Sequence, residues 1–134
     1  KQQVINEKNA QIKIEKLPVI SSNRVFLIQI FNELIDNALK FKKENSPLKI
    51  GIKFENLDSE WLFTVSDNGI GIEESYFEKI FVPFQKLHNK EEFSGTGIGL
   101  AIVKRIIYNL NGRIWLLSKP NEGATFYFTI KKNN

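Results

Sequence analysis

Two glycine-rich segments carry residue types that could bind a nucleotide. In the first, Gly95 to Leu100, glycine stands at every second position and an apolar run follows. Backbone N–H groups that no side chain covers, at the start of a helix, favour a phosphate. The second segment, 67–72, begins with Asp67, whose carboxylate could accept a hydrogen bond from an exocyclic amine such as adenine N6. Together the two segments predict a phosphate site and a base site.

Three polar residues further upstream complete the prediction. Glu33, Asn37 and Lys40 are spaced i, i+4 and i+7, so they share one face of a helix. Asn37 offers a neutral oxygen to Mg²⁺, which takes few protein ligands and completes its shell with phosphates and water. Lys40 could neutralise a phosphate. Glu33 could orient or deprotonate a nucleophile.

Each of these features also has a purely structural interpretation. The triple glycine could be a mobile hinge, and Asp67-Asn68-Gly69 is good turn chemistry. The polar helix face, taken alone, is best explained by solvent exposure. The combination of all three in one chain favours the nucleotide pocket.

The hydrophobic pattern predicts the elements that must position these residues. Alternation predicts strands, and apolar spacing of three and four predicts helices. The first long helix is predicted to bury a stripe of Ile28, Phe31, Ile35, Ala38 and Leu39. The expected elements, in order, are a strand at 11–16, a helix from 21–23 to about 43, strands at 48–54 and 61–66, a short helix at 73–81, a loop or lid at 82–96, a helix at 97–110, and strands at 114–118 and 125–131. This order predicts a two-layer α/β sandwich, a mixed β-sheet covered on one face by helices.

Composition limits the class of protein. The chain has 134 residues, enough for one domain with one core, and no cysteine, which excludes disulfides and fits a cytoplasmic address. The net charge is +4, but the lysines are dispersed and not interleaved with aromatic residues, so we expect no nucleic-acid partner.

The absence of methionine indicates a fragment. We expect residues 1–10 to end a preceding helix or linker and 11–134 to form the domain.

Five motifs in order resemble those of the catalytic, ATP-binding domain of sensor histidine kinases, within the GHKL ATPase superfamily. The resemblance covers nearly all of residues 11–131. The motifs are similar to the N box (32–41), the G1 box (67–72), the F box (77–84), the G2 box (95–100) and a G3-like motif (123–126). Residues 84–88, with Glu91 and Glu92 after them, are especially similar to phytochrome-type and other light- or PAS-linked kinases.

The resemblance implies the Bergerat fold, ATP and Mg²⁺. It assigns Asn37 to magnesium, Lys40 to phosphate and Asp67 to the adenine amino group. The other residues that it places around the nucleotide are Phe41, Gly69, Gly71 and Ile72 at the base, Leu100 as an apolar wall, Gly95, Thr96, Gly97, Ile98 and Gly99 at the phosphates, Thr125 near the base, and Phe84 as a lid anchor.

Two residues separate this chain from a simple match. Many histidine kinases carry Asn or His where this chain has Glu33, whereas hydrolysing relatives use a Glu there as general base. We interpret Glu33 as activating an incoming histidine imidazole. His88 is the only histidine, but it lies in the lid without a helical His-Glu motif, so we do not take it as the phosphate acceptor.

The resemblance also implies partners. They are a histidine-containing dimerisation domain of the same protein and the receiver domain of a response regulator. The fragment is expected to be monomeric and its parent a homodimer, and attachment of the parent to a membrane stays open. Three alternatives stay open: a GHKL hydrolase that uses Glu33 with water, a degenerate docking module, and a serine kinase that acts on a regulatory protein.

Overall fold

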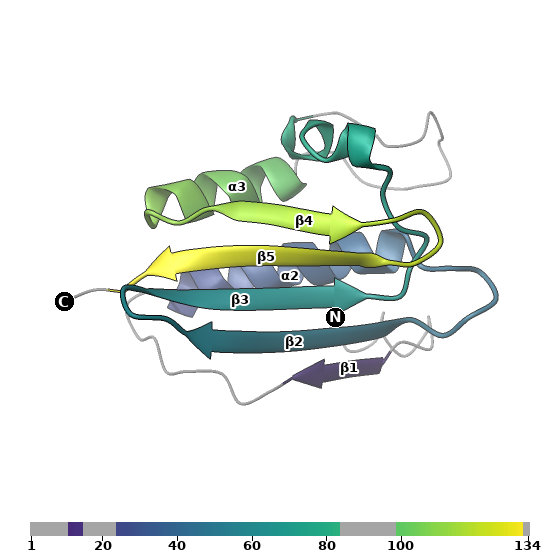
Figure 1. The fold of residues 1–134 in the computed structure, drawn as a ribbon, viewed down its shortest axis with the longest axis horizontal. Coiled ribbons are helices and arrows are strands. Elements are labelled where there is room, and N and C mark those ends of the chain that lie inside the picture. Colours follow the sequence, from purple (N-terminus) through teal and green to yellow (C-terminus); the bar gives the residue numbers. More distant parts are fainter. Residues whose placement is uncertain (1–10, 15–23, 84–98, 133–134) are drawn as a thin grey trace.

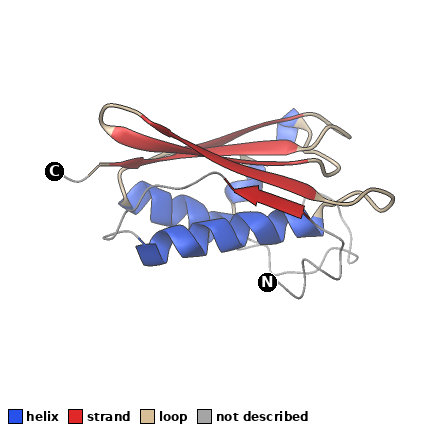
Figure 2. Cartoon of the chain, turned by 90° about the horizontal axis from the view of Figure 1, so that it is seen from below, coloured by secondary structure: helices blue, strands red, loops and turns tan. Residues whose placement is uncertain are grey.

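A five-stranded mixed sheet with helices on one face makes up the described part of the molecule (Figures 1 and 2). The computed structural model describes residues 11–14, 24–83 and 99–132. The strand order is β1-β2-β3-β5-β4, with β1 parallel to β2 and all other neighbours antiparallel. In Figure 2 the two long helices lie side by side beneath the sheet. The predicted two-layer α/β sandwich is confirmed.

The order of elements along the chain is also as predicted, and the differences concern their ends. The elements are β1 (Gln11–Ile14), α2 (Arg24–Lys40), β2 (Lys49–Asn56), β3 (Glu60–Asp67), the 3-10 turns η2 (Glu74–Tyr76) and η3 (Lys79–Phe81), α3 (Gly99–Asn109), β4 (Ile114–Ser118) and β5 (Ala124–Lys131). Most of the predicted lid falls in 84–98, outside the described residues. Within the described ranges, no helix is long and apolar enough to cross a membrane.

Helix α2 ends at Lys40, not at the predicted Lys43. The last helical bond runs from the Phe41 N–H to the Asn37 carbonyl, at 3.3 Å. The Phe41 carbonyl then accepts the Ile70 N–H at 2.9 Å. A bond from a distant segment therefore replaces the next helical turn.

The buried stripe of α2 differs from the predicted one at its first turns. Ile28 was predicted to be buried, but its side chain is 51% exposed, whereas Ile30 and Leu34 are almost completely covered. Ile28 shares the i, i+7 spacing with Ile35, which lies at the margin of the stripe. A small rotation of the helix is enough to leave Ile28 outside the contact with the sheet.

The predicted short helix at 73–81 is instead two separate 3-10 turns. The N–H groups of Tyr76, Phe77 and Phe81 each donate to the carbonyl three residues earlier, at 2.9 to 3.3 Å. The second turn is held by burial of Ile80 and Phe81. The Phe81 ring meets the Phe126 ring edge-on, with centroids 6.3 Å apart.

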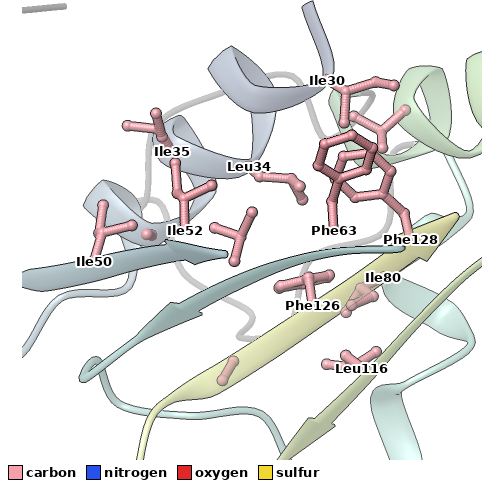
Figure 3. Close-up of a cluster of buried hydrophobic side chains, with 14 of the residues drawn as sticks. Ile30, Leu34, Ile35, Ile50, Ile52, Phe63, Ile80, Leu116, Phe126 and Phe128 are labelled. Atoms are coloured by element: carbon pink, nitrogen blue, oxygen red, sulfur yellow. The ribbon is translucent and has the colours of Figure 1, made fainter. Parts of the chain in front are cut away.

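Aromatic rings in the core fix α2 against the centre of the sheet. Phe63 of β3 and Phe128 of β5 stack with centroids 4.9 Å apart, and both are buried (Figure 3). Phe31 of α2 meets these rings edge-on, at 5.8 and 5.6 Å. Edge-to-face and offset-stacked rings are the favoured aromatic geometries. This cluster sets the height of α2 above β3, and so the place of Asn37 relative to Asp67.

Candidate functional site

Asp67 closes β3 with its carboxylate held by two backbone groups. One oxygen, Oδ1, accepts the N–H of Gly69 at 2.8 Å and the N–H of Ala124 at 3.2 Å. The two donors come from different segments, the loop after β3 and the start of β5. Because both bonds use one oxygen, the carboxylate is oriented, and among the residues that the structure describes none donates a hydrogen bond to Oδ2.

The surroundings of Asp67 change its acidity. Burial raises the pKa of the Asp67 carboxyl above its ordinary value, and the hydrogen bonds from Gly69 and Ala124 oppose this effect. Desolvation disfavours the charged form, while donors aimed at the carboxylate favour it. A carboxyl pKa raised by burial is found at many functional sites.

Glycines in the loop after β3 admit the backbone of the protein itself. An ideal Cβ at Gly69 would lie 2.5 Å from the Phe41 carbonyl oxygen. A Cβ at Gly71, where φ is +80°, would lie 2.1 Å from the Lys119 carbonyl oxygen. These glycines were predicted to let a base approach the backbone closely. In the structure, the backbone groups that lie close to them come from the end of α2 and from the β4–β5 turn.

Gly71→Ala is therefore expected to lower the free energy of unfolding by about 2 kcal/mol or more, since it combines backbone strain with a clash against a carbonyl. Urea denaturation measures the loss. Gly51→Ala is the matched control, because among the described residues its Cβ would meet the Ser66 hydroxyl alone, at 3.2 Å. Equal unfolding midpoints for the two variants would contradict this account of Gly71.

The next residue, Asn68, ties the loop to the start of β2. Its side chain donates to the Pro47 carbonyl at 3.1 Å and accepts the Lys49 N–H at 2.8 Å. The loop is thus held from both sides. Asn68 was predicted only as part of a turn, and its pairing with β2 could not be seen in the sequence.

The polar face of α2 is present, with Glu33, Asn37 and Lys40 all half-buried. Glu33 reaches across to α3, because a Cβ built at Gly99 would fall 2.3 Å from its Oε2. Gly99 is the first residue of α3. The Glu33 carboxylate thus lies at the start of a helix, where the N-terminal dipole favours negative charge. The N box and the end of the G2 box are brought together.

Thr125 was predicted to lie near the base, but it lies on the face of the sheet that points away from the helices. It pairs with Ser66 in β3, whereas the Ala124 N–H reaches Asp67. Side chains alternate between the two faces of a strand. Phe126 is buried beneath the helices, so Thr125 faces away from them with Tyr127, whose ring stacks on Trp115. The β5 residue beside Asp67 is Ala124, which sequence reasoning missed because its contribution is a backbone N–H.

Apolar residues predicted around the nucleotide occupy different depths. Ile72 is 4% exposed and belongs to the core, while Leu100 and Phe41 are half-buried. Six predicted residues lie outside the described ranges: Gly95, Thr96, Gly97, Ile98, Phe84 and His88. The structure therefore brings together the base end of the predicted pocket, the polar face of α2 and the start of α3.

Comparison with known proteins identifies the family. The model for the histidine kinase-, DNA gyrase B-, and HSP90-like ATPases matches residues 22–134. The chain belongs to this family. It is 47% identical over 132 residues to phytochrome-like protein Cph1 of Synechocystis sp., covering 98% of this chain and 18% of that protein. It is 51% identical over 128 residues to cyanobacterial phytochrome A of Nostoc sp., covering 96% of this chain and 17% of that protein.

A solved structure agrees with the sequence relatives. The catalytic domain of histidine kinase ThkA superposes with a TM-score of 0.77 at 30% identity, covering 98% of this chain and 84% of that one. The chain is an ATP-binding catalytic domain of the histidine kinase type, with the Bergerat fold. It spans less than a fifth of the two phytochrome relatives.

Proposed function

We propose that this ATPase-family domain transfers the γ-phosphoryl group of Mg–ATP to a histidine on a dimerisation domain of the same protein. The observation that carries the proposal is the Asp67 carboxylate, whose Oδ1 is fixed by the Gly69 and Ala124 N–H groups while no described residue donates to its Oδ2. An acceptor held in this way suits the 6-amino group of adenine, which is a donor only. The proposal that the bound nucleotide donates a phosphoryl group is supported by the match to the ATPase family.

Asn37 is proposed as the protein ligand of Mg²⁺. The described residues include no group of three or more His, Cys, Asp or Glu side chains able to hold a metal. A metal here would take most of its ligands from phosphate and water, which is the usual pattern for Mg²⁺. Asn37 is half-buried, and its neutral amide oxygen fits that donor set. When bound, the ion neutralises phosphate charge during transfer.

Lys40 and Glu33 complete the proposed machinery. Lys40 lies almost one helical turn after Asn37 and would neutralise phosphate charge. Glu33 would orient the attacking imidazole and receive its proton. Gly99 leaves the space in which the Glu33 carboxylate lies.

The wider setting is proposed on the same basis. The relatives named phytochromes are several times longer than this chain, so the acceptor histidine is expected on a part outside it. We infer a homodimeric parent, a receiver domain as the next phosphate acceptor, a monomeric isolated domain and a cytoplasmic address for the domain.

Calorimetric titration with a non-hydrolysable ATP analogue tests the nucleotide site. We expect binding that strengthens when Mg²⁺ is added. No binding at millimolar analogue would contradict the proposal and would favour the alternative of a docking module.

A second assay separates the kinase from the hydrolase. With a separately purified dimerisation domain added, we expect phosphate on the histidine of that domain and little ADP release in its absence. Steady ATP turnover by the domain alone would favour hydrolysis with Glu33 as base.

A further inference from the structure

The turn between β4 and β5 supports the loop that holds Asp67. The Asn121 N–H donates to the Ile70 carbonyl at 2.6 Å, and the Lys43 ammonium donates to the Asn121 carbonyl at 2.7 Å. The Lys119 carbonyl lies against Gly71, as described above. This turn, residues 119–123, therefore contacts the loop along most of its length, although the two are far apart in sequence.

Ser118, the last residue of β4, bonds both segments through one hydroxyl. Its Oγ accepts the Ile72 N–H at 2.8 Å and donates to the Gly123 carbonyl at 2.5 Å. Ile72 ends the loop that contains Gly69. Gly123 precedes Ala124. The hydroxyl thus joins the two segments whose N–H groups hold the Asp67 carboxylate.

We propose that Ser118 is a positioning residue for base recognition. It does not contact the nucleotide, and it acts by fixing the separation of the Gly69 and Ala124 donors, and with it the direction of Asp67 Oδ2. Recognition geometry must be held within a fraction of an ångström by supporting hydrogen bonds. The inference rests on the proposed function, since it needs Asp67 to face the base.

Gly123 shows how little freedom this arrangement has. Its φ is +82°, and an added Cβ would lie 2.0 Å from the Asp67 carbonyl oxygen. The backbone at the end of the β4–β5 turn therefore already lies against the backbone of Asp67. A shift of Gly123, once its carbonyl loses the Ser118 hydroxyl, would be passed directly to Asp67 and to the Ala124 N–H.

The test compares the affinities of ADP and IDP, which differ at the 6-position of the purine. Ser118→Ala is expected to reduce the wild-type preference for ADP by about tenfold, the scale of one well-made hydrogen bond. Ser118→Thr, which keeps the hydroxyl, is expected to retain the preference. Ser66→Ala is the control, because it removes a half-buried hydroxyl one residue from Asp67 whose bond, to the Gly51 carbonyl, is 3.4 Å long.

A purely structural role for Ser118 predicts a different result. In that case Ser118→Ala would weaken ADP and IDP equally, and the unchanged ratio would overturn the inference. If Ser118→Ala does not fold, Ser118→Cys carries the same comparison, since the thiol is a weak donor of similar size. A wild-type domain that shows no preference for ADP would refute the proposed base site itself, so the two failures are distinguishable.

Discussion

Asp67→Asn is expected to reverse the base preference of the domain and keep its fold. The two N–H donors of Gly69 and Ala124 require an acceptor, so the asparagine places its Oδ1 where the carboxylate Oδ1 lies. Its NH₂ group then occupies the position that faces the base. A donor there opposes the 6-amino group of adenine and suits the 6-oxo group of hypoxanthine.

We expect a large change in affinity, because two donors that face each other in a binding site leave both without an acceptor and destabilise the complex. ADP affinity should fall by about 100-fold or more while IDP affinity rises. Titration calorimetry with the two diphosphates measures both. Asp58→Asn, an exposed aspartate in the β2–β3 turn, is the control and should leave the ratio unchanged. An unaltered preference in Asp67→Asn would remove Asp67 from the base site.

The same variant has a defined stability signature. Burial raises the pKa of Asp67, so the folded domain holds this proton more tightly than the unfolded chain does. The wild-type domain therefore gains stability as pH falls through the raised pKa. Asp67→Asn carries no charge, so it should be at least as stable as wild type at neutral pH. Any such advantage should disappear as the pH is lowered.

Asn37→Ala is expected to abolish the effect of Mg²⁺ on nucleotide binding. The substitution removes the proposed ligand oxygen and replaces asparagine with a better helix former, so α2 should persist. Binding of a non-hydrolysable ATP analogue should become the same with and without Mg²⁺. Phosphoryl transfer to an added acceptor should fall by a factor of about 100 or more.

Asn32→Ala is the matched control for Asn37→Ala. Asn32 is also half-buried in α2 but lies on a different face of the helix. It should retain the Mg²⁺ effect. If Asn37→Ala still responds to Mg²⁺ as wild type does, the metal is held elsewhere.

The parts of the molecule that were predictable are those fixed by local pattern. Alternation located β2, β3, β4 and β5, because each has one face in the core. The Asp-Asn-Gly sequence marked the end of β3. The i, i+4, i+7 spacing placed Glu33, Asn37 and Lys40 on one face. The family motifs then supplied the Bergerat fold.

The parts that were not predictable depend on contacts between distant segments. The end of α2 is set by the bond from Ile70 to Phe41, and the side of β5 that carries Thr125 is set by its register with β3. Neither feature can be read from the residues that are close to it in sequence. The glycines after β3 were located correctly, but their neighbours, the carbonyls of Phe41 and Lys119, belong to other elements.

The pairing of β3 with β5 also determines when a growing chain can first bind a ligand. Asp67 and Ala124 are 57 residues apart, yet the bond between them is one of two that orient the carboxylate. A contact between residues so far apart in sequence forms slowly, and this one cannot form until β5 has been synthesised. During synthesis, α2, β2 and β3 can emerge from the ribosome and begin to collapse while the proposed base site still lacks its second donor. We therefore expect nucleotide to stabilise this domain on the ribosome only after β5 has paired with β3.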